Sequence, residues 1–194
     1  MSNIKVQGNA SGAGTTTLQS PNTANSATIT LPDPASADTL AALGVAQSFT
    51  GTQTFAGSSS ALAMILNDVA ETTTISATAA TGTINYDVTT QSVLYYTSNA
   101  SANWTVNFRA SSGTSLNTAM STGQTLTVVF LVTQGSTAYY NNVVQVDGSS
   151  VTPKWQQGTA PTAGNASSID AYVYSIVKTG NAAFTIFASQ TKFA

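Results

Sequence analysis

Residues 170–178 read DAYVYSIVK, and this stretch decides the fold class. Tyr172, Tyr174 and Ile176 occupy every second position, with smaller or β-branched residues between them. Successive side chains of a β-strand point to opposite faces, so the three large residues share one face. The stretch therefore predicts a strand that buries one face in a core.

Similar runs rich in Val, Ile, Thr, Tyr and Phe recur through the rest of the chain after residue 71. They lie at residues 72–78, 83–88, 92–97, 104–109, 124–133, 143–147 and 183–188. Turn residues separate them, and Asp147-Gly148 is typical of a tight hairpin. We therefore expect residues 71–194 to form an all-β domain, an antiparallel β-sandwich of jelly-roll type. One helical turn is expected at residues 115–121, with Ser115 as its N-cap.

The composition restricts the partners of this chain. Only 6% of its 194 residues are charged, and the formal net charge is −2. The five basic residues are spread along the chain, whereas phosphate binding needs clustered cations, so we do not expect a nucleic acid partner. Low net charge also gives little electrostatic protection against association, which suits a protein held in an assembly.

The first 58 residues differ from the rest, because large apolar residues are sparse there and Gly, Ser and Thr are frequent. Such a segment buries too little apolar surface to offset its own ordering entropy. We expect these residues to form an extended, β-rich attachment and oligomerisation segment that becomes ordered against a larger particle or against sister chains. Its predicted interface residues are Leu18, Ile29, Leu31, Phe49 and Phe55. A disordered leader is the alternative.

A short repeat lies at the end of this segment. QSFTG at residues 47–51 is followed by QTFAG at residues 53–57, so Phe49 and Phe55 are six positions apart. Six is even, and both rings would face one side of a strand. Rings stacked around a three-fold axis and a strand with two inward rings both explain the pattern. Residues 59–70 form a connector that favours neither helix nor strand.

The sequence lacks the residue types on which most catalytic sites depend. It has no His and no Cys, which removes the commonest general base and the usual zinc ligands. The seven acidic residues are scattered, and Arg109, the one arginine, is expected to pair with Asp87 or Asp170. We therefore expect no enzyme, cofactor or metal. The N-terminus has no secretory signal, and no apolar run is long enough to span a membrane.

Aromatic residues give the chain one candidate binding function. Tyr96, Tyr140 and Trp155 are candidate contacts for a glycan of a host surface, because sugar rings stack on exposed aromatic side chains. Most aromatic residues of a sandwich belong instead to the core or to subunit interfaces. An adjacent pair such as Tyr95-Tyr96 places one ring outward in any case.

Several stretches together resemble a module of tailed-phage virion proteins, especially those of cyanophages and other marine phages. They read GTINYDV at 82–88, NWTVNFR at 103–109, FLVTQG at 130–135, VDG at 146–148, KW at 154–155 and IDAY at 169–172. The N-terminal part, GTTTL at 14–18 through ITLP at 29–32, is similar to leaders of phage fibre and decoration proteins. The resemblance carries no catalytic residues.

The resemblance implies a bacteriophage structural protein, either a tail-fibre or a capsid-decoration subunit. We expect it in the virion, assembled in the cytoplasm of a bacterial host, as a homotrimer in contact with other capsid or tail proteins. Residues 1–58 would attach it and residues 71–194 would project. The alternative is a carbohydrate-binding adhesin domain that recognises host surface glycans.

Overall fold

The computed structural model describes residues 49, 52–55, 57, 62, 64–67 and 69–194. The chain divides into two units, Met1–Ala63 and Met64–Ala194, and the division falls inside the connector expected at residues 59–70. The described residues of the connector lie in neither a helix nor a strand. Leu18, Ile29 and Leu31, with the strands expected around them, lie outside the described residues.

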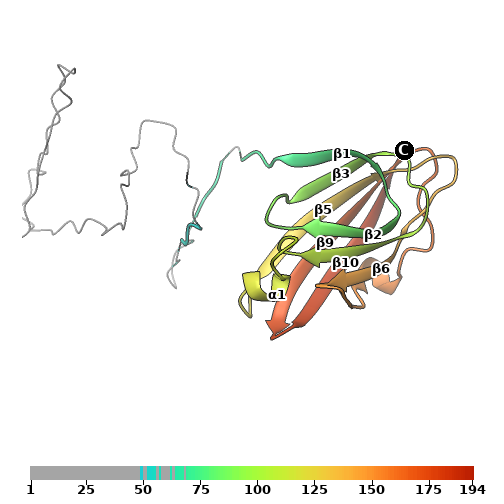
Figure 1. Ribbon diagram of the computed structural model, residues 1–194. Coiled ribbons are helices and arrows are strands. Elements are labelled where there is room, and N and C mark those ends of the chain that lie inside the picture. Colours follow the sequence, from blue (N-terminus) through green and yellow to red (C-terminus); the bar gives the residue numbers. More distant parts are fainter. Residues whose placement is uncertain (1–48, 50–51, 56, 58–61, 63, 68) are drawn as a thin grey trace, which may run out of the picture. The chain divides into compact units, whose positions relative to one another are not determined.

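Nearly all regular structure of the second unit is β-strand, and the strands form two sheets (Figure 1). The six-stranded sheet has the order β1 (Thr73–Ala79), β3 (Val93–Ser98), β5 (Thr125–Thr133), β9 (Ile169–Gly180), β10 (Ala183–Phe193) and β8 (Lys154–Trp155). The four-stranded sheet has the order β2 (Gly82–Asp87), β4 (Trp104–Arg109), β6 (Asn141–Val146) and β7 (Ser149–Ser150). The all-β class is confirmed.

The first six strands alternate between the two sheets. β1, β3 and β5 lie in one sheet and pair in parallel, while β2, β4 and β6 lie in the other and also pair in parallel. Parallel neighbours need a crossover connection, and here the intervening strand of the other sheet supplies it. β9 then pairs antiparallel with β5, and β10 antiparallel with β9.

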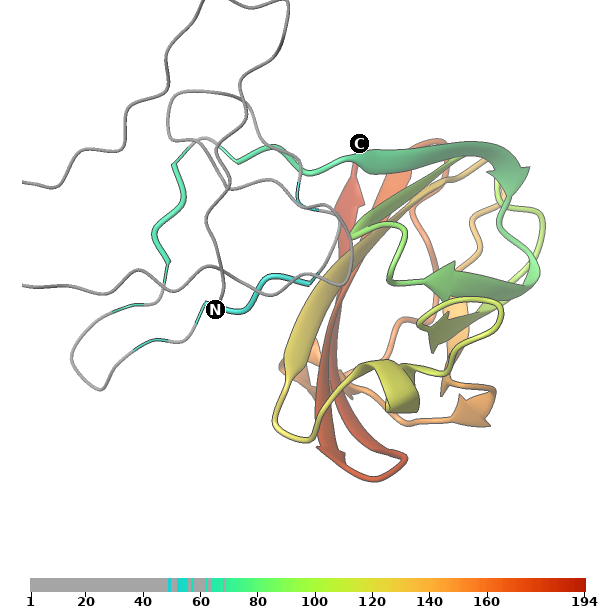
Figure 2. The same cartoon turned by 60° about the vertical axis from the view of Figure 1, so that its left-hand side comes forward.

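The expected strand arrangement therefore needs a correction. Of the eight strand pairings within the described residues, five are parallel, so both sheets are mixed and not antiparallel throughout. A jelly-roll arrangement, which rests on antiparallel pairs, is not confirmed. The sandwich itself is present, because the inner faces of both sheets contribute to one core (Figure 2).

Aromatic side chains dominate this core. Tyr86, Trp104 and Phe108 of the four-stranded sheet meet Phe130, Tyr172 and Tyr174 of the other sheet, and all six side chains are fully buried. Their rings are 4.9 to 6.4 Å apart between centroids, mostly edge to face, which is the geometry that aromatic pairs prefer. The inward placement of Tyr172, Tyr174 and Ile176 confirms the alternation read from residues 170–178.

Hydrogen bonds satisfy the hydroxyl groups buried with these rings. The Tyr86 hydroxyl donates to the carbonyls of Ser92 at 2.7 Å and Val129 at 3.0 Å. The Tyr174 hydroxyl donates to the Asn141 side chain at 3.1 Å. A buried polar group without a partner costs free energy. These hydrogen bonds therefore allow a tyrosine hydroxyl to be buried at positions 86 and 174 without that cost.

The helical turn expected near Ser115 is confirmed as α1 (Leu116–Ala119), which closes one end of the sandwich (Figure 1). The Ser115 hydroxyl accepts a hydrogen bond from the amide of Thr118 and so caps the helix, and Leu116 is fully buried. At the other end of α1, the Lys178 ammonium donates to the carbonyls of Asn117 and Met120. The Lys178 side chain is thus buried with its charge paired to helix carbonyls.

Candidate functional site

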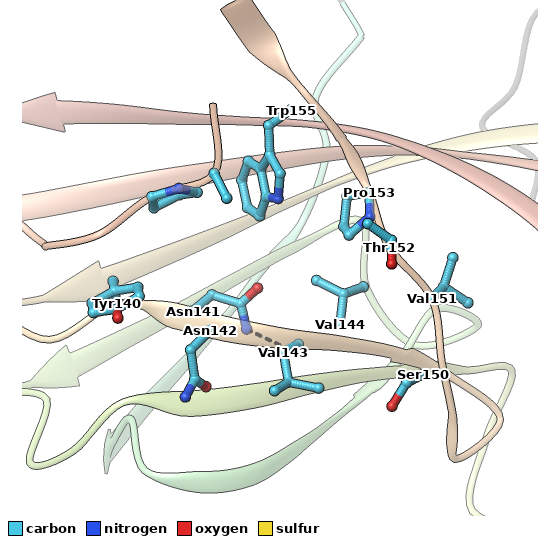
Figure 3. Close-up of a pocket in the computed structure, with 12 residues that line it drawn as sticks. Tyr140, Asn141, Asn142, Val143, Val144, Ser150, Val151, Thr152, Pro153 and Trp155 are labelled. Atoms are coloured by element: carbon cyan, nitrogen blue, oxygen red, sulfur yellow. Dashed lines mark hydrogen bonds between the residues drawn. The ribbon is translucent and has the colours of Figure 1, made fainter. Parts of the chain in front are cut away.

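A pocket of about 500 Å³ opens beside β6 and contains two of the three aromatic residues predicted as glycan contacts. Trp155 and Pro153 lie on one side of it, and Tyr140 and Asn142 on the side of β6 (Figure 3). The remaining lining comes from β6 and from the chain on either side of β8: Asn141, Val143, Val144, Ser150, Val151, Thr152, Ala160 and Pro161. The volume is typical of a small-molecule site.

An irregularity in β6 shapes the floor of the pocket. Trp104 of β4 pairs with Asn141, but the next residue, Thr105, pairs with Val143, so Asn142 is an extra residue in β6. Asn141 points into the core, where its amide donates to the carbonyls of Trp104 at 2.9 Å and Val143 at 2.8 Å. Asn142 is left exposed at the pocket. Bulges of this kind re-aim side chains near binding sites.

Contacts with β10 and with the core fix the position of Trp155, on the opposite side of the pocket. The backbone of Trp155 pairs with Ala188 of β10, and its ring packs edge-on against Tyr174 with 6.2 Å between centroids. Pro153 and Pro161 have fixed backbone φ angles, which stiffens the segments that carry them. The Trp155 ring is half-buried, so its position is fixed while part of its surface faces the pocket.

The polar side chains that line the pocket are uncharged, and several of them are free to form hydrogen bonds with a ligand. Within the described part of the chain, the side chains of Asn142, Ser150 and Thr152 and the Tyr140 hydroxyl have no hydrogen-bond partner in the protein. An amide and hydroxyls beside an aromatic ring match the alternating polar and apolar surface of a sugar. Glycoside hydrolysis needs two carboxylates, and the described lining includes none.

The third predicted contact does not join this pocket. Tyr96 lies on β3, which β5, β9 and β10 separate from β8 in the six-stranded sheet. Its ring points inward against Phe130, with 5.1 Å between centroids, and burial raises the pKa of its hydroxyl. Tyr95 is the outward member of the pair. Of the three predicted glycan contacts, Tyr140 and Trp155 therefore share a pocket and Tyr96 does not.

Sequence reasoning missed the polar half of the pocket. Asn142, Ser150 and Thr152 carry no motif, and only their closeness to the turn at Asp147-Gly148 and to Trp155 links them. The prediction that Asp147-Gly148 forms a hairpin turn is confirmed, since both residues have positive φ and join β6 to β7. This turn brings Ser150 back beside β6.

Two of the predicted interface residues, Phe49 and Phe55, and the single arginine, Arg109, do not line this pocket. Phe49 and Phe55 are 61% and 57% exposed, and the described residues of the repeat are assigned to no strand, so the inward placement of the two rings stays a prediction. Arg109 pairs with Asp87, not with Asp170, through its Nε and through Nη2 at 3.3 Å. This pair lies where parallel β2 and β4 end side by side.

The described residues contain no cluster of three or more metal-ligating side chains, and no helix among them is long and apolar enough to cross a membrane. No family model matches the chain, and comparisons with curated proteins and with solved structures found no similar protein.

Proposed function

We propose that this chain is a non-enzymatic structural subunit of a bacteriophage particle, a surface-exposed fibre or capsid-decoration protein. Residues 1–58 anchor it to the particle or to sister chains, and the sandwich projects. The resemblance to tailed-phage virion proteins gives the biological setting. The described residues supply a physical argument for assembly that is independent of that resemblance.

That argument is the exposure of large apolar side chains ahead of the first strand. Six side chains are more than half exposed, and a seventh, Met64, is 42% exposed. The six are Phe49, Phe55, Leu62, Ile65, Leu66 and Val69. Burying one such side chain is worth about 1.5–3 kcal/mol, so a lone chain leaves a large stabilisation unused. Phe49 and Phe55 belong to the anchoring segment and the other four follow it, and each can gain stability by packing against a partner.

The low charge of the chain fits the same role. A subunit that adheres through apolar surface and hydroxyl groups depends little on ion pairs, and salt screens ion pairs but not apolar contacts. Adhesion of this kind needs neither a catalytic residue nor a cofactor.

Deleting residues 2–58 tests the anchor. The shortened chain is expected to stay soluble and folded by circular dichroism but to be missing from purified particles in an immunoblot. The milder variant Phe49→Ser/Phe55→Ser is expected to reduce incorporation, and Thr152→Ala on the sandwich serves as its control. Undiminished incorporation of the deletion variant would refute the anchor role.

A second candidate function is glycan binding, and the pocket between Trp155 and Tyr140 favours it. Glycan-array binding by the purified chain is expected to fall at least tenfold in Asn142→Ala, which removes no hydrogen bond within the protein. Trp155→Ala should abolish binding, although the loss of its contact with Tyr174 requires a check of folding. Asn99→Ala is the matched control, because Asn99 is an exposed asparagine outside the pocket whose side chain makes no hydrogen bond within the described part of the chain.

A further inference from the structure

The two sheets of the sandwich differ in the chemistry of their outer faces. On the four-stranded sheet, the Asn107 amide donates to the Asn85 side chain at 2.8 Å, and Arg109 pairs with Asp87 next to them. These side chains alternate with core residues, so they point away from the core, although Asn107 is itself buried. A polar outer face with an ion pair is typical of a sheet that borders water.

The outer face of the six-stranded sheet is apolar in its centre. Strand register places Val93, Val129 and Val173 in one row across β3, β5 and β9. The adjacent row on the same face is Tyr95, Leu131 and Ala171, which Ile75 of β1 continues. None of these residues belongs to the core cluster, because their strand neighbours point inward. Ile75 is exposed, Ala171 is buried at 7% exposure, and the other five are half-buried.

Charged groups are confined to the margins of this face. The positions that flank the two rows are filled by hydroxyl and apolar side chains: Thr73, Thr125, Thr127, Ser175, Val177, Thr185, Phe187, Ser189 and Thr191. Among the described residues, Lys154 lies on the edge strand β8 and Glu71 ahead of β1. Asp170, Lys178 and Lys192 lie on β9 and β10, but they alternate with the residues of this face and so project from the other side of the sheet. Phe187 is 53% and Ile75 68% exposed.

The size of this face is sufficient for a specific contact. Five strands spaced about 4.8 Å apart, with roughly seven residues of about 3.3 Å each, cover about 550 Å². Two such faces in contact bury about 1,100 Å² in projection alone. A specific protein interface needs about 1,000 Å², so the face is large enough without help from other surfaces.

We propose that the outer face of the six-stranded sheet is the contact surface between copies of this chain. In a two-fold contact both copies use the same face, so a charge near the symmetry axis would lie close to the like charge of the other copy. The outward positions of β1, β3, β5, β9 and β10 carry no charged side chain, which removes this cost, and the Val, Leu and Tyr side chains supply the apolar area. The polar outer face of the four-stranded sheet then faces water. This contact between copies forms in solution and does not require a particle.

The test measures the mass of the purified full-length chain by light scattering after size exclusion. The unaltered chain is expected to be an oligomer of the 19.7 kDa subunit. Val129→Lys places a charge in the centre of the face and is expected to raise the dissociation constant at least a hundredfold, which leaves monomers at micromolar concentration. Thr127→Lys, at an exposed position on the same strand, serves if Val129→Lys fails to fold.

Val143→Lys is the matched control, because it exchanges valine for lysine on the outer face of the four-stranded sheet. It is expected to leave the mass unchanged. A monomeric unaltered chain would overturn the proposal. So would an oligomer that survives both Val129→Lys and Thr127→Lys in a chain that also carries Phe49→Ser/Phe55→Ser, which weakens contacts through residues 1–58. Either result is compatible with normal incorporation into particles, so the failure of this inference is distinguishable from the failure of the anchor role.

Discussion

The Asp147 carboxylate accepts a hydrogen bond from the backbone amide of Leu116 at 2.6 Å, across 31 positions of sequence. Its second oxygen accepts from the next amide, that of Asn117, at 2.9 Å. The turn between β6 and β7 thus holds the first turn of α1, and α1 places Leu116 in the core. A negative charge at a helix N-terminus is favourable, and these amides have no partner inside the helix.

Asp147→Asn is expected to lower the free energy of unfolding by about 1–2 kcal/mol, because the charge and one of the two acceptors are lost. Asparagine tolerates the positive φ of this position, so the turn itself should persist. Urea denaturation measures the change. Glu71→Gln makes the same chemical exchange at an exposed site and should shift stability by less than about 0.5 kcal/mol. Equal effects of the two variants would contradict the capping role.

Gly164 occupies a position with no room for a side chain. A Cβ atom there would overlap the Tyr139 carbonyl and lie 2.7 Å from Asp170 Oδ2 and 2.9 Å from Gln134 Nε2. Gly164→Ala is therefore expected to lower the free energy of unfolding by about 1–3 kcal/mol. Gly113→Ala is the control, since a Cβ at Gly113 meets nothing within 4 Å. Thermal unfolding that ranks the two variants equally would contradict the steric argument.

Asp170 is a buried carboxyl whose titration is expected to affect stability. Burial raises its pKa above that of an unfolded aspartate, against the opposing effect of hydrogen bonds from Asn165 and Gln134 and of the Lys192 charge. A raised pKa means that the folded state binds the proton more tightly. The contribution of Asp170 to stability is therefore complete below about pH 3.9, the unfolded pKa, and is lost as the pH rises through the folded pKa.

Asp170→Asn removes this titration while it keeps an oxygen that can accept from Gln134. The free energy of unfolding of the variant minus that of the unaltered chain is expected to be more positive at pH 7 than at pH 3. Urea denaturation at the two pH values measures the difference. A difference independent of pH would show that Asp170 titrates alike in the folded and unfolded states.

The strands were well predicted because alternation and turn residues are local signals. Each of the eight predicted runs overlaps a strand, and the run at 104–109 coincides with β4. The two-residue strands β7 and β8 were missed, since two residues carry no periodicity. Their pairing depends on neighbours such as Phe187, which is far away in sequence.

The direction of pairing was beyond the sequence signal. An inward-outward alternation is the same in parallel and antiparallel strands, and the short connections favoured antiparallel neighbours. Consecutive strands instead go to opposite sheets. Likewise, composition could suggest that Tyr140 and Trp155 bind a ligand, but the face on which Tyr96 lies depends on the register of β3, which adjacent tyrosines leave ambiguous.

The closing hairpin of β9 and β10 has a consequence for synthesis on the ribosome. Its inward residues, among them Tyr172, Tyr174, Ile176 and Ile186, form much of one wall of the core, and β9 also supplies the antiparallel neighbour of β5. While these residues are still untranslated, the first six strands lack part of the core and the strand that pairs with β5. The nascent chain must stay unaggregated until β9 and β10 emerge, and a stop codon ahead of β9 should yield a product for degradation, not a shortened sandwich.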